Sequence, residues 1–321
     1  MNLDSTENNR IKNFPIMMYA IVMGMSGLTI TYQKAHLWLN FSPLFGIILM
    51  YITSIIFLVV TLMYIIKFIK YNSFVKKEFS HPIRLNFFAA VSISMLMLSI
   101  IYKDYNDLIS CFLWYPGTLI HFYLTMHTIS FWINHNQEID HSNPAWFIPI
   151  VGNLLVPLAG VGFVDTNILM YFFSVGLFFW FVLFSIIFNR IIFHHQLAVK
   201  FIPTLFIFIA PPAVAFLAYF KMYHQIDIFA NILFNIAIFF TLLIAFMYKN
   251  FLKIKFFISW WAFVFPIAAM AISSMVMYHE LNTVTLLLFS YFMVFITTII
   301  IFIVIYQTIK NITNHNVCIE E

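Results

Sequence analysis

Long apolar segments separated by short polar stretches are the feature that most restricts how this 321-residue chain can fold. A helix needs about 20 mostly apolar residues to cross a bilayer. The apolar runs are continuous rather than alternating, which excludes a membrane β-barrel. We predict an all-α integral membrane protein with ten transmembrane helices, at about residues 14–32, 43–69, 84–102, 108–133, 144–162, 166–190, 202–220, 226–248, 257–278 and 284–309.

The composition supports this class, because 63% of the residues are hydrophobic and only 9% are charged. A soluble protein of this size could not hydrate such a surface, whereas lipid can cover it. No small-residue cleavage site follows the first apolar run, so we interpret that run as a retained helix. The expected organisation is a cytoplasmic N-terminal tail (1–13), a transmembrane channel domain (14–309) and a cytoplasmic C-terminal tail (310–321).

The basic residues predict the orientation of the chain. Of the 16 Lys and Arg residues, all except Lys34, Lys103 and Lys221 lie in the tails or beside the loops that follow even-numbered helices. Cytoplasmic loops carry such an excess of Lys and Arg. We therefore expect both termini in the cytoplasm, in a plasma membrane (the inner membrane of a bacterium), with membrane lipid as a partner.

Proline and helix spacing divide the ten helices into odd and even sets. The odd helices begin at intervals of about 70, 60, 58 and 55 residues, which indicates a helical hairpin repeated five times. Prolines gather at the starts and in the interiors of odd helices, where they remove backbone hydrogen bonds and kink the helix. The expected kinks are at Pro15, Pro149, Pro157, Pro211, Pro212 and Pro266.

Small and weakly polar residues follow the same division. Even helices carry bulky apolar side chains that suit lipid, whereas odd helices carry glycine, alanine and hydroxyl groups. Taken singly, each small residue is explained by tight helix packing, and that alternative stays open. Taken together, they favour an inner ring of odd helices around a central path. The candidate lining residues are Gly24, Ser26, Gly27, Ser92, Asn153, Thr204, Ala269 and Ser273.

Charge is absent from the centres of the predicted helices. No Asp or Glu lies there, and the only candidate proton relays are His121 and His127, six residues apart on an even helix. We favour structural roles for both and keep a relay as the alternative. The chain carries no enzyme signature, and we expect no catalytic residue, metal or organic cofactor. Nucleic acid is not expected as a partner, because topology accounts for the basic residues.

Five stretches, one per odd helix, carry a family resemblance. They are "FPIMMYAIVMGMSGL", "HPIRLNFFA", "IPIVGNLLVPLAG", "PTLFIFIAPPAVAFLAY" and "WWAFVFPIAA". Their set and order resemble the tellurite-resistance/dicarboxylate transporter family, which includes TehA-like proteins and the slow anion channels of plants. The resemblance implies five hairpins in a quasi-fivefold arrangement, with the odd helices lining a central pore. It also implies a homotrimer with one pore in each subunit.

The resemblance further implies a phenylalanine on the ninth helix that plugs the pore, and the matching residue is Phe265. A bend at Pro266 would direct Phe265 into the lumen; the alternative is a packed core phenylalanine. Arg84, two residues after Pro82, is a candidate residue of the pore mouth, and contact with a carboxylate such as Glu78 is the alternative. Kinked helices can point hydroxyls and backbone NH groups at an anion.

Three functions are consistent with these features. The first is an anion channel, or channel-like transporter, that passes small monovalent anions such as chloride and nitrate. The second is a secondary carrier of C4-dicarboxylates, sulfite or tellurite-type oxyanions, proton-coupled through His121 or His127. The third is a membrane scaffold or sensor, which the short tails disfavour. The partners expected for the first two are small inorganic or organic anions.

Overall fold

The structure, a computed structural model, describes residues 10–252 and 254–318. This part of the chain is helical throughout, with no strand beyond one isolated bridge between Val161 and Val164. Eight helices are long and apolar enough to cross a membrane: Ile16–Leu39, Pro43–Lys70, Arg84–Tyr102, Thr166–Phe193, Val199–Tyr223, Ile228–Phe246, Ile258–Leu281 and Val284–Thr313. The other two predicted segments are also helical, at Asp107–Asn134 and, in several short pieces, at Pro144–Gly160.

Five of these segments are single uninterrupted α-helices, which we call the outer helices. They are α3 (Pro43–Lys70), α6 (Asp107–Asn134), α9 (Thr166–Phe193), α11 (Ile228–Phe246) and α13 (Val284–Thr313). Four of them start after a polar residue whose side chain accepts a hydrogen bond from the first-turn backbone: Ser42, Asn106, Asp165 and Asp227. Such caps satisfy backbone NH groups that a new helix leaves unpaired.

The other five segments, which we call the inner segments, each begin as a tight 3₁₀ helix and then become α-helical. They are η1–α2 (Ile16–Met18, Tyr19–Leu39), η2–α5 (Arg84–Phe88, Ala89–Tyr102), η6–α10 (Val199–Ile209, Ala210–Tyr223) and η8–α12 (Ile258–Phe263, Val264–Leu281). The fifth passes from 3₁₀ to α-helix twice. It consists of η4 (Pro144–Phe147), α7 (Ile148–Val151), η5 (Gly152–Leu154) and α8 (Leu155–Gly160).

Prolines lie close to these changes of helix type. Pro266 is the third residue of α12, and Pro211 and Pro212 are the second and third residues of α10. A proline in the first turn lacks an NH group that the helix start leaves unpaired in any case. Pro149 and Pro157 hold similar places in α7 and α8, and Pro15 immediately precedes η1.

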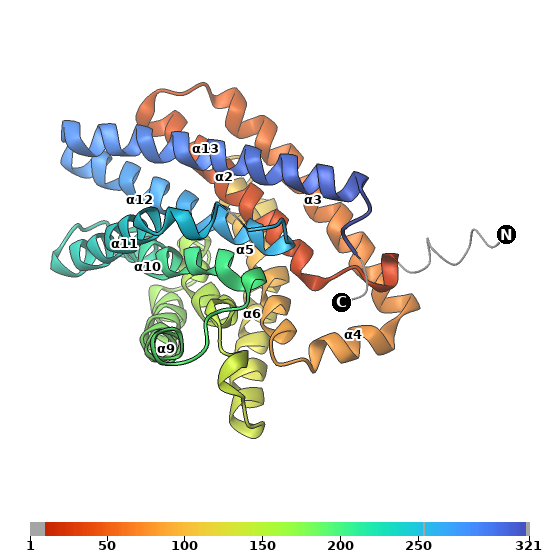
Figure 1. Cartoon of the computed structure of the whole chain (residues 1–321). Coiled ribbons are helices and arrows are strands. Elements are labelled where there is room, and N and C mark those ends of the chain that lie inside the picture. Colours follow the sequence, from red (N-terminus) through yellow and green to blue (C-terminus); the bar gives the residue numbers. More distant parts are fainter. Residues whose placement is uncertain (1–9, 253, 319–321) are drawn as a thin grey trace.

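The inner segments form a closed ring inside the outer helices. Among the eight apolar helices, the inner ones are 72–83% buried and the outer ones 22–33%. Neighbouring inner segments pack together in chain order, and α12 packs against α2 to close the ring (Figure 1). Each inner segment also packs on the outer helix that follows it. Short connections join the two at one end of the bundle, which we call the turn end.

A buried ion pair holds the start of the first inner segment. Lys67 Nζ at the end of α3 lies 2.7 Å from Glu78 Oε2 on α4 (Asn72–Phe79), and both side chains are at most 5% exposed. Lys67 also donates to the carbonyl of Phe14, and Glu78 Oε1 accepts from the backbone NH of Ile16. Tyr64 donates to Glu78 as well. The network satisfies both charges and fixes where the first inner segment begins.

Candidate functional site

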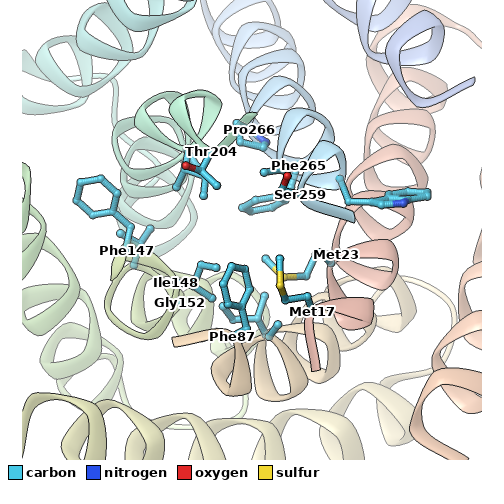
Figure 2. A pocket seen from close by; sticks show the side chains of 18 of the residues that line it. Met17, Met23, Phe87, Phe147, Ile148, Gly152, Thr204, Ser259, Phe265 and Pro266 are labelled. Carbon is cyan, nitrogen blue, oxygen red and sulfur yellow. The ribbon is translucent and has the colours of Figure 1, made fainter. Parts of the chain in front are cut away.

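A cavity lies inside the ring of inner segments, with about 780 Å³ of empty space that includes open solvent. All five inner segments contribute to its wall and no outer helix does. Figure 2 shows side chains from all five around an open space. The lining residues are Met17, Ala20, Met23, Phe87, Ala90, Ile93, Phe147, Ile148, Val151, Gly152, Leu155, Thr204, Ile207, Ala210, Val214, Ile258, Ser259, Trp261, Ala262, Phe265 and Pro266.

The wall is almost entirely apolar. No charged side chain is among the lining residues that the structure describes. The two hydroxyls of the wall are engaged with backbone: Thr204 Oγ1 donates to the Phe201 carbonyl at 2.6 Å, and Ser259 Oγ donates to the Lys200 carbonyl at 2.6 Å. A wall of this kind offers weak solvation to an ion and no fixed countercharge.

Phe265 lies on this wall, as the second residue of α12, and its side chain is only partly buried. In Figure 2 it lies across the open space from Phe87 of η2. On its other side is Gly27 of α2, where a Cβ atom would lie 3.6 Å from Phe265 Cδ2. The ring therefore stands between the cavity and the glycine face of α2.

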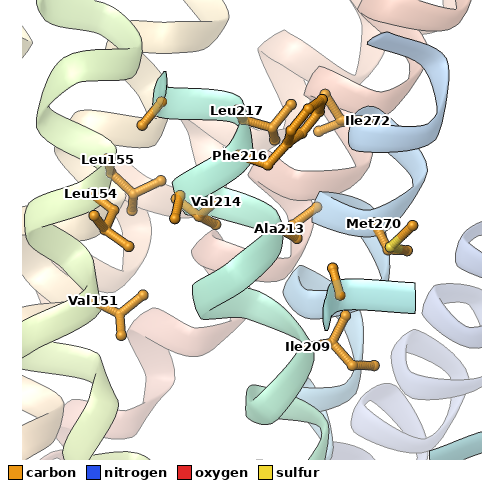
Figure 3. Close-up of a cluster of buried hydrophobic side chains, with 14 of the residues drawn as sticks. Val151, Leu154, Leu155, Ile209, Ala213, Val214, Phe216, Leu217, Met270 and Ile272 are labelled. Carbon is orange, nitrogen blue, oxygen red and sulfur yellow. The ribbon is translucent and has the colours of Figure 1, made fainter. Parts of the chain in front are cut away.

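Beyond Phe265, towards the turn end, buried apolar side chains of α10 and α12 belong to the main core cluster. Figure 3 shows Leu217 and Phe216 of α10 near Ile272 of α12, all in one continuous core cluster. Leu217 and Ile272 are 7% and 8% exposed.

Three of the predicted lining residues lie on α2. Gly24 and Gly27 lie at the contact between α2 and the last inner segment, where added Cβ atoms would lie 2.7 Å from Trp261 Cε3 and 2.9 Å from Ala268 Cβ. Ser26 is fully buried, and its hydroxyl has no hydrogen-bond partner among the described residues. None of the three belongs to the cavity wall.

The other predicted lining residues divide between the wall and helix contacts. Thr204 is on the wall. Ser92 pairs with His121 Nδ1 at 2.9 Å, and the Asn153 amide donates to Thr125, so both face α6. Ser273 donates to the Ala213 carbonyl of α10, and Ala269 is buried in the core cluster.

His121 and His127 of α6 occupy different surroundings. His121 is fully buried, and its Nε2 makes no hydrogen bond with the described residues. A Cβ atom on Gly152, a wall residue, would lie 2.2 Å from His121 Cε1, so the imidazole lies directly behind the cavity wall. His127 instead stacks between the rings of Phe79 and Tyr123.

Sequence reasoning missed most of the wall, including Met17, Met23, Phe87, Phe147 and Ile148. Their spacing carried a signal, because wall residues recur at intervals of three or four, as in Met17–Ala20–Met23 and Phe87–Ala90–Ile93. Such intervals place residues on one face of a 3₁₀ or α-helix. The sequence alone does not state which face points inward.

Basic groups gather where the inner segments begin, at the end of the bundle opposite the turn end. His81, just before η2, lies within electrostatic range of Arg84, His141 and Lys200. Burial, together with these positive groups, lowers the pKa of His81. Its Nδ1 accepts from the backbone NH of Ile83 at 3.1 Å, which caps the start of η2. Arg84 thus belongs to a group of basic residues where two inner segments begin, which we call the basic rim.

Comparison with known proteins decides the family. Residues 13–309 match the SLAC1 family, described as voltage-dependent anion channels. The chain belongs to this family. It is 30% identical over 267 residues to the S-type anion channel SLAH2 of Arabidopsis thaliana, covering 80% of this chain and 51% of SLAH2. It is 27% identical over 286 residues to the tellurite resistance protein TehA homolog of Haemophilus influenzae, covering 84% of each.

Membership confirms the resemblance drawn from the five odd-helix stretches. The chain is an integral membrane protein of a family described as voltage-dependent anion channels, and not of an enzyme family. It spans about half the length of SLAH2.

Proposed function

We propose that this SLAC1-family chain forms a passive path for small monovalent anions such as chloride and nitrate, gated by Phe265. The observation that carries the proposal is the cavity, which all five inner segments line and at whose wall the Phe265 ring stands. Beyond it, towards the turn end, Leu217 of α10 and Ile272 of α12 belong to the main core cluster. Movement of one ring and its apolar neighbours would join the cavity to the turn end.

The wall favours weakly hydrated anions. An ion that enters an apolar passage must lose water without gaining a fixed countercharge, so the cost of dehydration ranks the ions. Nitrate and chloride lose water more readily than sulfate or dicarboxylates. The basic rim around Arg84 and Lys200 raises the local concentration of anions at one entrance.

We propose that the chain crosses the membrane ten times, as five hairpins in quasi-fivefold arrangement with the inner segments around the pore. The closed packing of the inner segments supports this arrangement. An even number of crossings agrees with Val317 and Cys318 packing near Ile16. The one-sided distribution of Lys and Arg supports cytoplasmic termini and a plasma-membrane location, the inner membrane in a bacterium. The homotrimer rests on the family resemblance.

The test is anion flux through Phe265→Ala in planar bilayers, with chloride, nitrate and malate. Removing the ring should raise nitrate and chloride current roughly tenfold or more, because steric occlusion is relieved. Phe263→Ala is the matched control: Phe263 is two residues away and packs against Phe206, but it does not line the cavity. Unchanged current in folded Phe265→Ala protein, or equal currents in both variants, would contradict the gate.

The second candidate is a carrier of C4-dicarboxylates, sulfite or tellurite-type oxyanions, with His121 as a proton relay. The buried imidazole behind Gly152 is the observation that favours it. A carrier would show saturable uptake driven by a pH gradient and abolished in His121→Gln. Non-saturating current that is unaffected by the same substitution would exclude this mechanism. His127→Gln serves as the comparison, because His127 stacks between Phe79 and Tyr123 instead.

A further inference from the structure

The charged residues at the turn end are arranged by layer. The lysines of that end, Lys34, Lys103 and Lys221, belong to the inner segments or directly follow one. Three carboxylates instead lie at the starts of outer helices: Asp107, Asp165 and Asp227. Acids at helix N-termini and bases at C-termini complement the helix dipoles. Asp104, just after α5, and Glu280 of α12 depart from this arrangement, so the inner layer at this end carries both signs with lysine in excess.

Two of the three lysines lie on the helix faces that line the cavity. Ile207 of η6, and Val214 and Lys221 of α10, follow one another at intervals of seven residues, and the first two line the cavity. On the first inner segment, Ala20, which lines the cavity, precedes Lys34 by fourteen residues, or about four turns. On each of these two inner segments, the residues that face the cavity form a stripe along the helix. Lys34 and Lys221 therefore lie at the turn-end limits of these two stripes. Lys103, just after α5, lies off the stripe of its segment.

Lys221 has no ion pair and donates no hydrogen bond within the described part of the chain, although its side chain is only partly exposed. It lies within electrostatic range of Lys34, Lys103 and Asp104. Asp104 already pairs with Lys34, and Lys103 pairs with Asp107, so Lys221 lies among like charges with no carboxylate of its own, which is unfavourable. The space beside the Lys221 ammonium is therefore suited to an anion from solution.

Lys34 can join the same site. Its Nζ lies 3.2 Å from Asp104 Oδ2, and the Asp104 side chain is 60% exposed against 23% for Lys34. An exposed pair of this kind contributes little to stability, so an arriving anion can share or replace the aspartate. Lys103, by comparison, is engaged with Asp107 at 2.8 Å and lies over the Phe163 ring. At the end of α12, His279 and Glu280 lie 3.9 Å apart and offset each other when the imidazole is protonated.

We propose that Lys34 and Lys221 form a binding site for a small monovalent anion at the turn-end mouth of the path. The site deepens the proposed function and rests on it for its role in transport. All five inner segments place their C-termini at this end, and each terminus carries roughly half a negative charge. Without the two lysines, these helix ends would repel the ions that the path conducts.

The first test measures local potential and needs no transport. Trp38 is a native reporter, because Lys34 Nζ lies 5.7 Å from the centre of its ring. Its fluorescence is taken as the difference between each protein and the same protein with Trp38→Phe, in neutral detergent at low salt. Iodide is the anionic quencher and caesium the cationic one. Lys221→Gln should lower the iodide-to-caesium quenching ratio about twofold, and Lys221→Arg should preserve it.

Lys103→Gln is the matched control for this measurement, because it removes one lysine of the same end that is already paired. It should change the ratio less than half as much as Lys221→Gln. An unchanged ratio in Lys221→Gln would overturn the site. An equal fall in both variants would also overturn it, because the lysines would then act only as general surface charge.

The second test measures transport, with anion supplied at the turn end of protein that carries Phe265→Ala. Adding Lys34→Gln and Lys221→Gln should raise the concentration that gives half-maximal nitrate current about threefold. A normal half-maximal concentration would mean that the anion site lies off the route, contrary to the proposal. Absence of current in every variant would instead count against the channel, while the quenching ratio still decides whether the anion site exists.

Discussion

Gly27 of α2 packs directly against Phe265 of α12: a Cβ atom on the glycine would lie 3.6 Å from both Cα and Cδ2 of the phenylalanine. The same atom would lie only 2.9 Å from Ala268 Cβ. The absence of a side chain at Gly27 thus sets how closely α2 and α12 approach at the level of the proposed gate. Gly27, which the sequence assigned to the pore lining, instead packs against the proposed gating residue.

Gly27→Ala should therefore separate α2 from α12 by a few tenths of an ångström. Overpacking of this kind costs about 1–3 kcal/mol, seen as a lower midpoint of thermal unfolding. Adding Ala268→Gly removes the opposing methyl. A glycine inside a helix costs about 1 kcal/mol, and relief of the clash should recover more stability than this cost. Strictly additive losses in the double variant would show that the two residues do not oppose each other.

The Lys67–Glu78 pair gives a larger effect on stability. Glu78→Gln leaves a buried ammonium without its counterion, and such a change costs about 3–5 kcal/mol. Lys67→Met together with Glu78→Gln should recover part of the loss, because no buried charge remains. Asp107→Asn is the comparison: its pair with Lys103 is exposed on the aspartate side and should contribute less than about 1 kcal/mol. Denaturation in mild detergent would measure all three differences.

Gly152→Ala tests the packing of the cavity wall on His121. Its new methyl would lie 2.2 Å from Cε1 and 2.6 Å from Nε2 of the imidazole, so the ring or the backbone must move. We expect a loss of about 1–3 kcal/mol in the free energy of unfolding. His121→Ala in the same protein opens the space and should make the alanine at 152 tolerable. If Gly152→Ala costs the same with and without His121, the predicted clash is absent.

The folded protein should become less stable in mild acid because of His81. The pKa of His81 in the folded protein lies below its ordinary value of 6.5, so the unfolded chain takes up the proton first. The contribution of neutral His81 to the free energy of unfolding is complete above pH 6.5. It decreases as the pH falls from there through the folded-state pKa. Protonation of Nδ1 also removes the acceptor that caps η2.

His81→Asn should remove this part of the pH dependence, because the amide oxygen can cap η2 without titrating. Thermal unfolding of both proteins between pH 7.5 and pH 5 would measure the difference. Parallel curves over that range would show that other groups set the acid sensitivity.

The positions of the helices could be predicted closely from apolar length alone. The expected segment 84–102 coincides with Arg84–Tyr102, and 43–69 differs from Pro43–Lys70 by one residue. The first segment was expected to end at 32 and continues to Leu39. Polar side chains do not end this helix, because Gln33 donates to the Ile101 carbonyl and Lys34 pairs with Asp104. Those partners lie about 70 residues away and are invisible to a local pattern.

The wall of the cavity was less predictable than the helices. Phe265 and Thr204 are on it, whereas Gly24, Gly27 and Ser273 are at helix contacts. Small residues serve both purposes, and only the rotation of each helix separates them. The 3₁₀ starts also left no sequence signal, since apolar residues fit either helix type. The role of Lys67 was equally hidden, because its partner reaches it only through the return of α4.

The junction between η8 and α12 has a mechanical consequence. A 3₁₀ helix advances about 2.0 Å and turns 120° per residue, whereas an α-helix advances about 1.5 Å and turns 100°. Moving the junction by one residue thus rotates everything beyond it by about 20° and changes the segment length by about 0.5 Å. Phe265 is the second residue past this junction. Its ring would therefore rotate and shift along the helix axis together with the junction. Each of the other four inner segments contains a junction of the same kind.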